Sequence, residues 1–259
     1  MPIVYPLVGR YKSPCYHLRV MNLPRPVSSD ATRTRILDVA ERLVQTRGFN
    51  GFSYADIAAE VGVTKASLHY HFATKADLGC TLVVRYTEGF AAALKAISDA
   101  AADAPAQLRA YVKLYSDVLA ERRLCLCGMV AAEYGTLPAP MQAALRVFFG
   151  VNESWLSRLL EEGSRDGSLD LRVAPLEAAR MLVGALEGAM LVARAYGDPE
   201  RFTGAADLLV RQLEREDPAA RARASARTAP HPLPQPARLA SGARASGVRA
   251  SGRQRARPR

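Results

Sequence analysis

The sequence predicts an all-α protein, and three observations support that prediction. Apolar residues recur at spacings of three and four through most of residues 32–216, as they do on the buried face of a helix. A hydroxyl residue followed three positions later by aspartate, the pattern of a helix capping box, occurs twice. Candidate strands are few. The 259 residues, 49% of them apolar, are sufficient to bury a core.

The first helices are expected in residues 30–78. From about Thr32 until Gly48, a common helix stop, five apolar residues recur at helical spacing. They are Ile36, Leu37, Ala40, Leu43 and Val44. Ser53 and Asp56 then have the spacing of a capping box, with aspartate in place of the usual glutamate or glutamine, and open a short second helix.

A tight turn follows that second helix. Gly62-Val63-Thr64 ends it, and Thr64 can cap a third helix whose inner face carries Leu68 and Phe72. The second capping box, Thr74 to Asp77, opens a helix that is expected to reach about Ala100. A long helix, a short helix, a three-residue turn and another short helix together make a helix-turn-helix domain.

Residues 79–217 are expected to form a second helical domain. Beyond Asp103, prolines and glycines separate five further helices. These are expected at about 105–122, 125–135, 140–163, 175–196 and 199–216. In the fourth of these, Gly184 and Gly188 lie one turn apart and leave a flat strip that another helix can approach. That helix can belong to a second subunit or to the same one.

Both ends of the chain are expected to be disordered. Residues 1–29 have no helical or strand period and contain five prolines, and Met21 is a second possible start. Residues 218–259 contain ten arginines, no lysine and no acidic residue. The net charge of +10 is therefore that of the tail, and residues 1–217 sum to zero, with 25 basic and 25 acidic side chains.

Composition excludes several classes of protein. No apolar stretch reaches the roughly 18–20 residues that a membrane helix needs, and the N-terminus lacks the basic front of a secretory signal. Four cysteines do not make a disulfide scaffold, which favours a reducing cytoplasm. His69 and His71 do not share a helix face, and two clustered cysteines are too few for zinc, so neither a metal nor a cofactor is expected.

The helix-turn-helix segment points to DNA. Small and polar residues on the outer face of its last helix can reach base edges in a major groove about 12 Å wide. The segment resembles the TetR family of bacterial transcriptional regulators in the order and spacing of several short motifs. They are Gly48-Phe49, Ile57-Ala58, Val61-Gly62-Val63, Leu68-His-Tyr-His-Phe72 and Lys75-Ala-Asp-Leu78.

The resemblance implies a homodimer with a DNA-binding head and a ligand-binding body, which represses transcription until a small molecule releases it from double-stranded operator DNA. Four residues would then face base edges: Lys65, Ala66, Ser67 and His69. Five would meet the DNA backbone: Ser53, Tyr54, Tyr70, His71 and Lys75. Position 66 is often Gly or Pro in the family, and position 69 is often Tyr or Phe. Base preference therefore cannot be copied from a relative.

Cys125 is a candidate sensor. Some family members that respond to electrophiles and oxidants carry a cysteine eight residues before a glutamate, as Cys125 lies before Glu133. Arg122, Arg123 and the start of a helix are expected to lower the pKa of its thiol. The alternative is that Cys125 and Cys127 are buried apolar thiols.

Two aromatic residues, Tyr115 and Trp155, are candidate ligand contacts, although most aromatic residues of the body are expected in its core. Two other functions are weighed against the regulator. One is a thiol redox enzyme that uses Cys125 and Cys127, which lack the CxxC spacing of such enzymes. The other is a protein that coats DNA without specificity through its arginine tail. We therefore expect a regulator and no enzyme.

Overall fold

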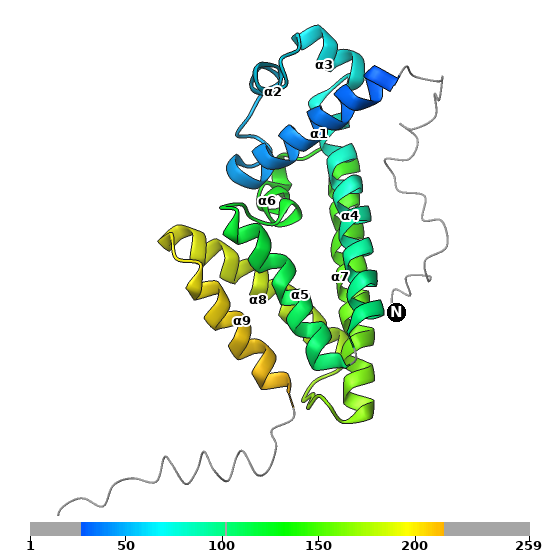
Figure 1. Cartoon of the computed structure of the whole chain (residues 1–259), viewed down its shortest axis with the longest axis vertical. Helices are drawn as coiled ribbons and strands as arrows, with labels where there is room; N and C mark the ends of the chain where they lie inside the picture. The colour runs from blue at the N-terminus through cyan, green and yellow to red at the C-terminus, as the bar shows by residue number, and fades with distance from the viewer. Residues whose placement is uncertain (1–26, 102, 215–259) are drawn as a thin grey trace, which may run out of the picture. The chain divides into compact units, whose positions relative to one another are not determined.

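The computed structural model describes residues 27–101 and 103–214. Regular structure in this part of the chain consists of nine α-helices and one short 3-10 helix (Figure 1), with an isolated bridge between Leu169 and Glu214. The helices are α1 (Val27–Arg47), α2 (Tyr54–Val61), α3 (Lys65–His71), α4 (Lys75–Ala100), α5 (Ala104–Ala120), α6 (Leu126–Ala132), η2 (Tyr134–Thr136), α7 (Ala139–Asp166), α8 (Pro175–Tyr196) and α9 (Glu200–Leu213). The predicted all-α class is confirmed.

Several helix boundaries differ from those expected. Helix α1 begins at Val27, so the last three residues of the expected N-terminal extension are helical. Asp30 lies in its first turn, where a carboxylate stabilises the positive end of the helix dipole. The helix expected over 125–135 is shorter and ends at Ala132, before η2. Residues 1–26, with Met21, and the arginine-rich tail at 218–259 lie outside the described residues.

The three-helix head, α1 to α3, has the local structure that its caps predict. The Asp56 carboxylate accepts hydrogen bonds from both the backbone N–H and the hydroxyl of Ser53. The Thr64 hydroxyl accepts from the backbone N–H of Ser67. Gly62 turns the chain between α2 and α3 with φ +73°, a left-handed conformation that glycine adopts at little cost.

The body is built around the two long helices α4 and α7, which pack against each other (Figure 1). Helix α8 packs on α7, and α9 packs on α8 and α5. A cluster of aromatic rings fills the interior: Phe90 and Phe148 have ring centroids 5.3 Å apart, and Tyr111 and Tyr115 5.4 Å. The buried apolar side chains of head and body form one continuous cluster, so the head is fixed on the body.

Candidate functional site

The outer face of α3 is exposed, as the sequence predicts. Lys65, Ala66, His69 and Tyr70 lie at the surface, and the Tyr70 side chain is 68% exposed. Ser67 is half-buried, and Leu68 on the opposite face is completely buried. The short helix therefore anchors itself through one apolar residue and presents a row of small, polar and aromatic side chains to the solvent.

The end of α3 is tied to α2 by two side chains. The Tyr54 hydroxyl donates a hydrogen bond of 2.9 Å to the backbone carbonyl of Phe72, and burial raises the pKa of Tyr54 to about 12, so this hydroxyl remains protonated. The His69 ring lies 4.9 Å from the Tyr54 ring, and its Nδ1 is 3.0 Å from the Ala73 carbonyl oxygen. Both residues, expected at the DNA, thus also hold the recognition helix in place.

Lys75 has a role that the sequence did not predict. Its side chain is half-buried, and its ammonium donates a hydrogen bond to the backbone carbonyl of Phe52. The ammonium also lies over the Phe49 and Phe52 rings, 4.8 and 4.2 Å from their centroids, at cation–π distance. Desolvation lowers the pKa of Lys75. Lys75 therefore holds the loop before α2 against α4, and its contact with phosphate remains a prediction.

A set of polar contacts joins the head to the body. The backbone N–H of Asn50 donates to Oε2 of Glu133 at 2.9 Å, and its side-chain amide donates to the Thr136 hydroxyl at 2.8 Å. The Arg194 guanidinium donates to the backbone carbonyl of Thr46 at 2.7 Å. The end of α1 and the loop after it are therefore held by the end of α6, by η2 and by α8. Residues 46, 50, 136 and 194 were not singled out from the sequence, and Glu133 was noted only for its spacing from Cys125.

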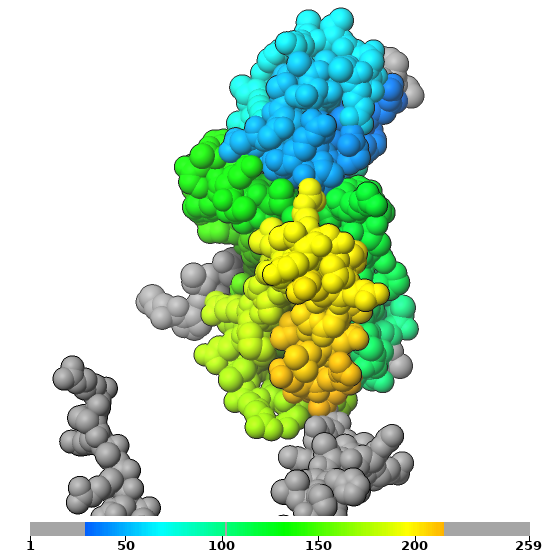
Figure 2. All heavy atoms as spheres, turned by 90° about the vertical axis from the view of Figure 1, so that its left-hand side faces the viewer, coloured from blue at the N-terminus to red at the C-terminus, as the bar shows by residue number. Residues whose placement is uncertain are grey.

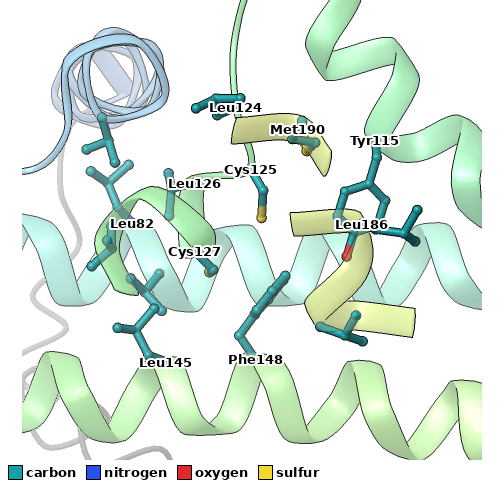
Figure 3. Close-up of a cluster of buried hydrophobic side chains, with 14 of the residues drawn as sticks. Leu82, Tyr115, Leu124, Cys125, Leu126, Cys127, Leu145, Phe148, Leu186 and Met190 are labelled. Atoms are coloured by element: carbon teal, nitrogen blue, oxygen red, sulfur yellow. The ribbon is translucent and has the colours of Figure 1, made fainter. Parts of the chain in front are cut away.

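Cys125 lies deep in the body. It precedes α6, and its side chain points into a cluster of buried side chains that includes Tyr115, Phe148 and Leu186 from α5, α7 and α8 (Figure 3). Burial raises the pKa of the Cys125 thiol above its ordinary range, and the nearby charge of Glu187 raises it further. The expectation that Arg122 and Arg123 lower this pKa is wrong, because desolvation disfavours the thiolate more than the helix terminus favours it. Cys127 is also buried, with its pKa raised for the same reason.

Glu187 is the acidic residue that faces this cysteine. The Cys125 thiol forms a hydrogen bond with the Glu187 carboxyl group, and the Tyr86 hydroxyl lies 3.9 Å from the Cys125 sulfur. Gly128 in α6 makes the approach possible, because a Cβ atom there would lie only 2.2 Å from Oε2 of Glu187. Burial raises the pKa of Glu187 to about 7.

The two aromatic candidates differ in their surroundings. Burial raises the pKa of Tyr115, the nearby charge of Glu187 raises it further, and the Tyr115 hydroxyl lies 3.0 Å from the Tyr111 hydroxyl. Trp155 instead donates its indole N–H to the Ser98 hydroxyl at 2.9 Å. The structure therefore brings Tyr115, Cys125 and Glu187 into one region, whereas the hydrogen bond of Trp155 connects α7 to α4.

Comparison with known proteins agrees with this architecture. Residues 36–78 match the family described as "Bacterial regulatory proteins, tetR family", and residues 104–209 match "Tetracyclin repressor-like, C-terminal domain". The transcriptional regulator AcuR of Cereibacter sphaeroides is 31% identical over 182 residues, which are 68% of this chain and 81% of AcuR. The chain belongs to the TetR family. It is a transcriptional regulator with a helix-turn-helix DNA-binding domain.

Solved TetR-family structures share the fold. A regulator from Agrobacterium tumefaciens is 32% identical, with a TM-score of 0.70 over 72% of this chain and all of the other. A regulator from Legionella pneumophila is also 32% identical, with a TM-score of 0.63 over 75% of this chain and all of the other. These matches support neither a thiol redox enzyme nor a general DNA-coating protein. No helix in the described ranges is long and apolar enough to cross a membrane.

Several large apolar side chains of α8 and α9 are exposed to solvent. They are Met181, Leu191, Val192 and Tyr196 on α8 and Leu208 on α9. Figure 2 shows α9 and the adjoining end of α8 on the face toward the viewer. A Cβ atom added at Gly184 or Gly188 would meet nothing within 4 Å. The flat strip expected from these two glycines is therefore uncovered within one subunit.

Glu187 could have been found from the sequence. It lies four residues after Val183 and three before Met190, both of which are buried. A charged residue inside the apolar stripe of a helix is a signal in itself, because an unpaired buried charge is costly.

Proposed function

We propose that the protein is a homodimeric repressor that binds operator DNA through α3 and is released by a small-molecule effector bound in its body. The observation that supports operator binding is the exposed row of side chains on α3, in a head held by two capping boxes and the Tyr54 hydrogen bond. A rigid helix with an open outer face suits the major groove. Such a regulator acts in the cytoplasm, where the chromosome lies.

Within this proposal the expected DNA contacts divide into two groups. Lys65, Ala66, Ser67 and His69 face base edges, and their replacement changes base preference at a cost of about 1–3 kcal/mol for a favoured base. The other group contacts the backbone and weakens all sites alike when it is changed: Ser53, Tyr54, Tyr70, His71 and Lys75. Phosphate contacts position the protein, whereas base contacts select the sequence.

Selection from random duplexes tests the recognition helix. The full-length protein should enrich one two-fold symmetric site, and Lys65→Ala should bind that site more weakly with a relaxed preference at one position of each half-site. Lys95→Ala removes an exposed lysine that pairs with Asp99 on α4, so it serves as the matched control and should bind as the wild type does. Enrichment of no common site would contradict the proposal.

The dimer is proposed to form through α8 and α9, because their apolar surface is uncovered in the single subunit. Leu191→Glu places a charge in that surface and should give a monomer in sedimentation experiments. Val173 is equally apolar and as exposed, about half in each case, but precedes α8. Val173→Glu is therefore the control and should remain dimeric. A dimeric Leu191→Glu protein would place the interface elsewhere.

The effector is proposed to bind reversibly in the region of Tyr115 and Cys125. The buried thiol with a raised pKa does not favour the thiolate that reacts with electrophiles. A reversible ligand needs no thiolate, and the carboxyl group of Glu187 offers it a polar contact among aromatic rings. Release of operator DNA by covalent modification of the Cys125 thiol is the alternative, and it is tested below with Cys125→Ser.

A further inference from the structure

A buried carboxyl oxygen in the body has no protein partner. Within the described residues, Oε1 of Glu187 is inaccessible to solvent and makes no hydrogen bond. The residue as a whole is half-buried, so it is not sealed from the surface. An orphaned buried acceptor costs about 1–3 kcal/mol, and most such groups in native proteins are satisfied. The unpaired Oε1 atom of Glu187 therefore points to a hydrogen-bond donor that is supplied from outside the chain.

The surroundings of Glu187 contain no compensating positive charge. The titratable side chains that respond to its charge are Tyr86 from α4, Tyr111 and Tyr115 from α5, and Cys125 and Cys127 from the start of α6. In all five, burial raises the pKa, so they are uncharged at neutral pH. No lysine or arginine is among the groups that shift the pKa of Glu187. An ionised Glu187 is therefore unpaired.

We propose that Glu187 anchors the effector and that the effector is a small organic ammonium ion carrying an apolar or aromatic group. This inference rests on the proposed function, since it names the ligand class of the proposed effector site. The ammonium N–H donates to Oε1, and its charge neutralises the carboxylate. A charge-assisted hydrogen bond of this kind is among the stronger ones in proteins.

The neighbouring rings fit the rest of such a ligand. Tyr86 and Phe148 have ring centroids 5.7 Å apart, and Phe90 lies 5.3 Å from Phe148. Figure 3 shows Tyr115, Phe148 and Leu186 converging beside Cys125. Aromatic faces attract cations, and the aliphatic side chains provide an apolar surface. An anionic ligand would instead place a second negative charge beside Glu187, and an alcohol would leave the carboxylate charge unpaired.

Helix α6 connects Glu187 to the DNA-binding head. Glu187 contacts α6 at Gly128, and five residues later Glu133 at the end of α6 accepts the hydrogen bond from Asn50 in the head. A ligand that draws Glu187 away from Cys125 changes the packing of α6. It shifts the conformational equilibrium only to the extent that it binds the two conformations differently.

Calorimetry on the full-length protein at pH 8 tests the anchor. The probes share one shape and differ in charge: benzylammonium, benzyl alcohol and benzoate, with butylammonium as a smaller cation. At least one ammonium ion should bind the wild type, and Glu187→Gln should weaken it by about tenfold or more. Benzyl alcohol should bind both proteins alike. Glu162→Gln makes the same change at an exposed position of α7 and should have no effect.

Three results would overturn the proposal. They are failure of both ammonium ions to bind the wild type, equal affinity of an ammonium ion for the wild type and Glu187→Gln, and tighter binding of benzoate than of benzylammonium. If Glu187→Gln fails to fold, the pH dependence of butylammonium affinity in the wild type tests the proposal instead. Affinity for butylammonium should rise about tenfold per pH unit up to pH 7 and then level off, because the carboxylate is the binding form. A flat profile would also overturn it.

Operator binding by the ligand-free protein is measured separately. Its absence refutes the proposed function, whereas calorimetry still decides whether Glu187 binds ammonium ions. Its presence together with failed ammonium binding refutes the anchor alone.

Discussion

Replacing Glu187 by glutamine should stabilise the protein more at pH 8 than at pH 5. Burial raises the pKa of Glu187 from 4.5 to about 7, so the folded state holds a proton that the unfolded state has already lost. Between these two pH values the folded state binds more protons, and the free energy of unfolding therefore falls as pH rises. The cost is small below pH 4.5 and complete above about pH 7.

The size of the effect follows from the pKa shift. A shift of one unit corresponds to 1.36 kcal/mol, so a shift from 4.5 to about 7 costs about 3 kcal/mol above pH 7. Because about 1 kcal/mol of this is already present at pH 5, the change between pH 5 and pH 8 is about 2 kcal/mol. Glutamine has nearly the same shape and carries no charge, so Glu187→Gln should lack this pH-dependent cost.

Urea denaturation at one fixed protein concentration measures this pH-dependent cost of Glu187. The free energies of unfolding of wild type, Glu187→Gln and Glu162→Gln are compared at pH 5 and pH 8. The difference between Glu187→Gln and wild type should grow in favour of the variant by about 2 kcal/mol between the two pH values. The exposed control at position 162 should show little change. An equal difference at both pH values would refute the argument that Glu187 is an unpaired buried acid.

Three further predictions concern Lys75, the Cys125 thiol and the arginine-rich tail. Lys75→Ala should lower the free energy of unfolding by about 1–3 kcal/mol and also weaken DNA binding. Lys95→Ala should do neither, and urea denaturation of both variants checks the change in stability. A mild thiol reagent should release operator DNA no more readily from the wild type and Cys127→Ser than from Cys125→Ser in a gel-shift assay, because burial disfavours the reactive thiolate; release that Cys125→Ser alone resists would make Cys125 the switch. Deleting residues 218–259 should lower affinity for random DNA at low salt and leave the preferred operator unchanged, and a changed operator preference would contradict this.

Residue spacing was enough to predict the local structure of the head. Ser53 with Asp56 and Thr74 with Asp77 cap helices through atoms three residues apart, so their hydrogen bonds are visible in the spacing. Gly62 marks the turn because its left-handed φ is a local property. The exposed face of α3 follows from Leu68, because one buried residue fixes which side of a short helix points outward.

Contacts between distant segments could be known only from the folded chain. Position 75 is expected at phosphate from the family pattern, but its ammonium turns inward because the Phe52 carbonyl and two aromatic rings lie beside it. The pKa of Cys125 was predicted in the wrong direction because two arginines precede it in sequence, whereas burial and Glu187 surround it in space. Desolvation depends on every segment that packs around a group, and spacing along one helix cannot reveal it.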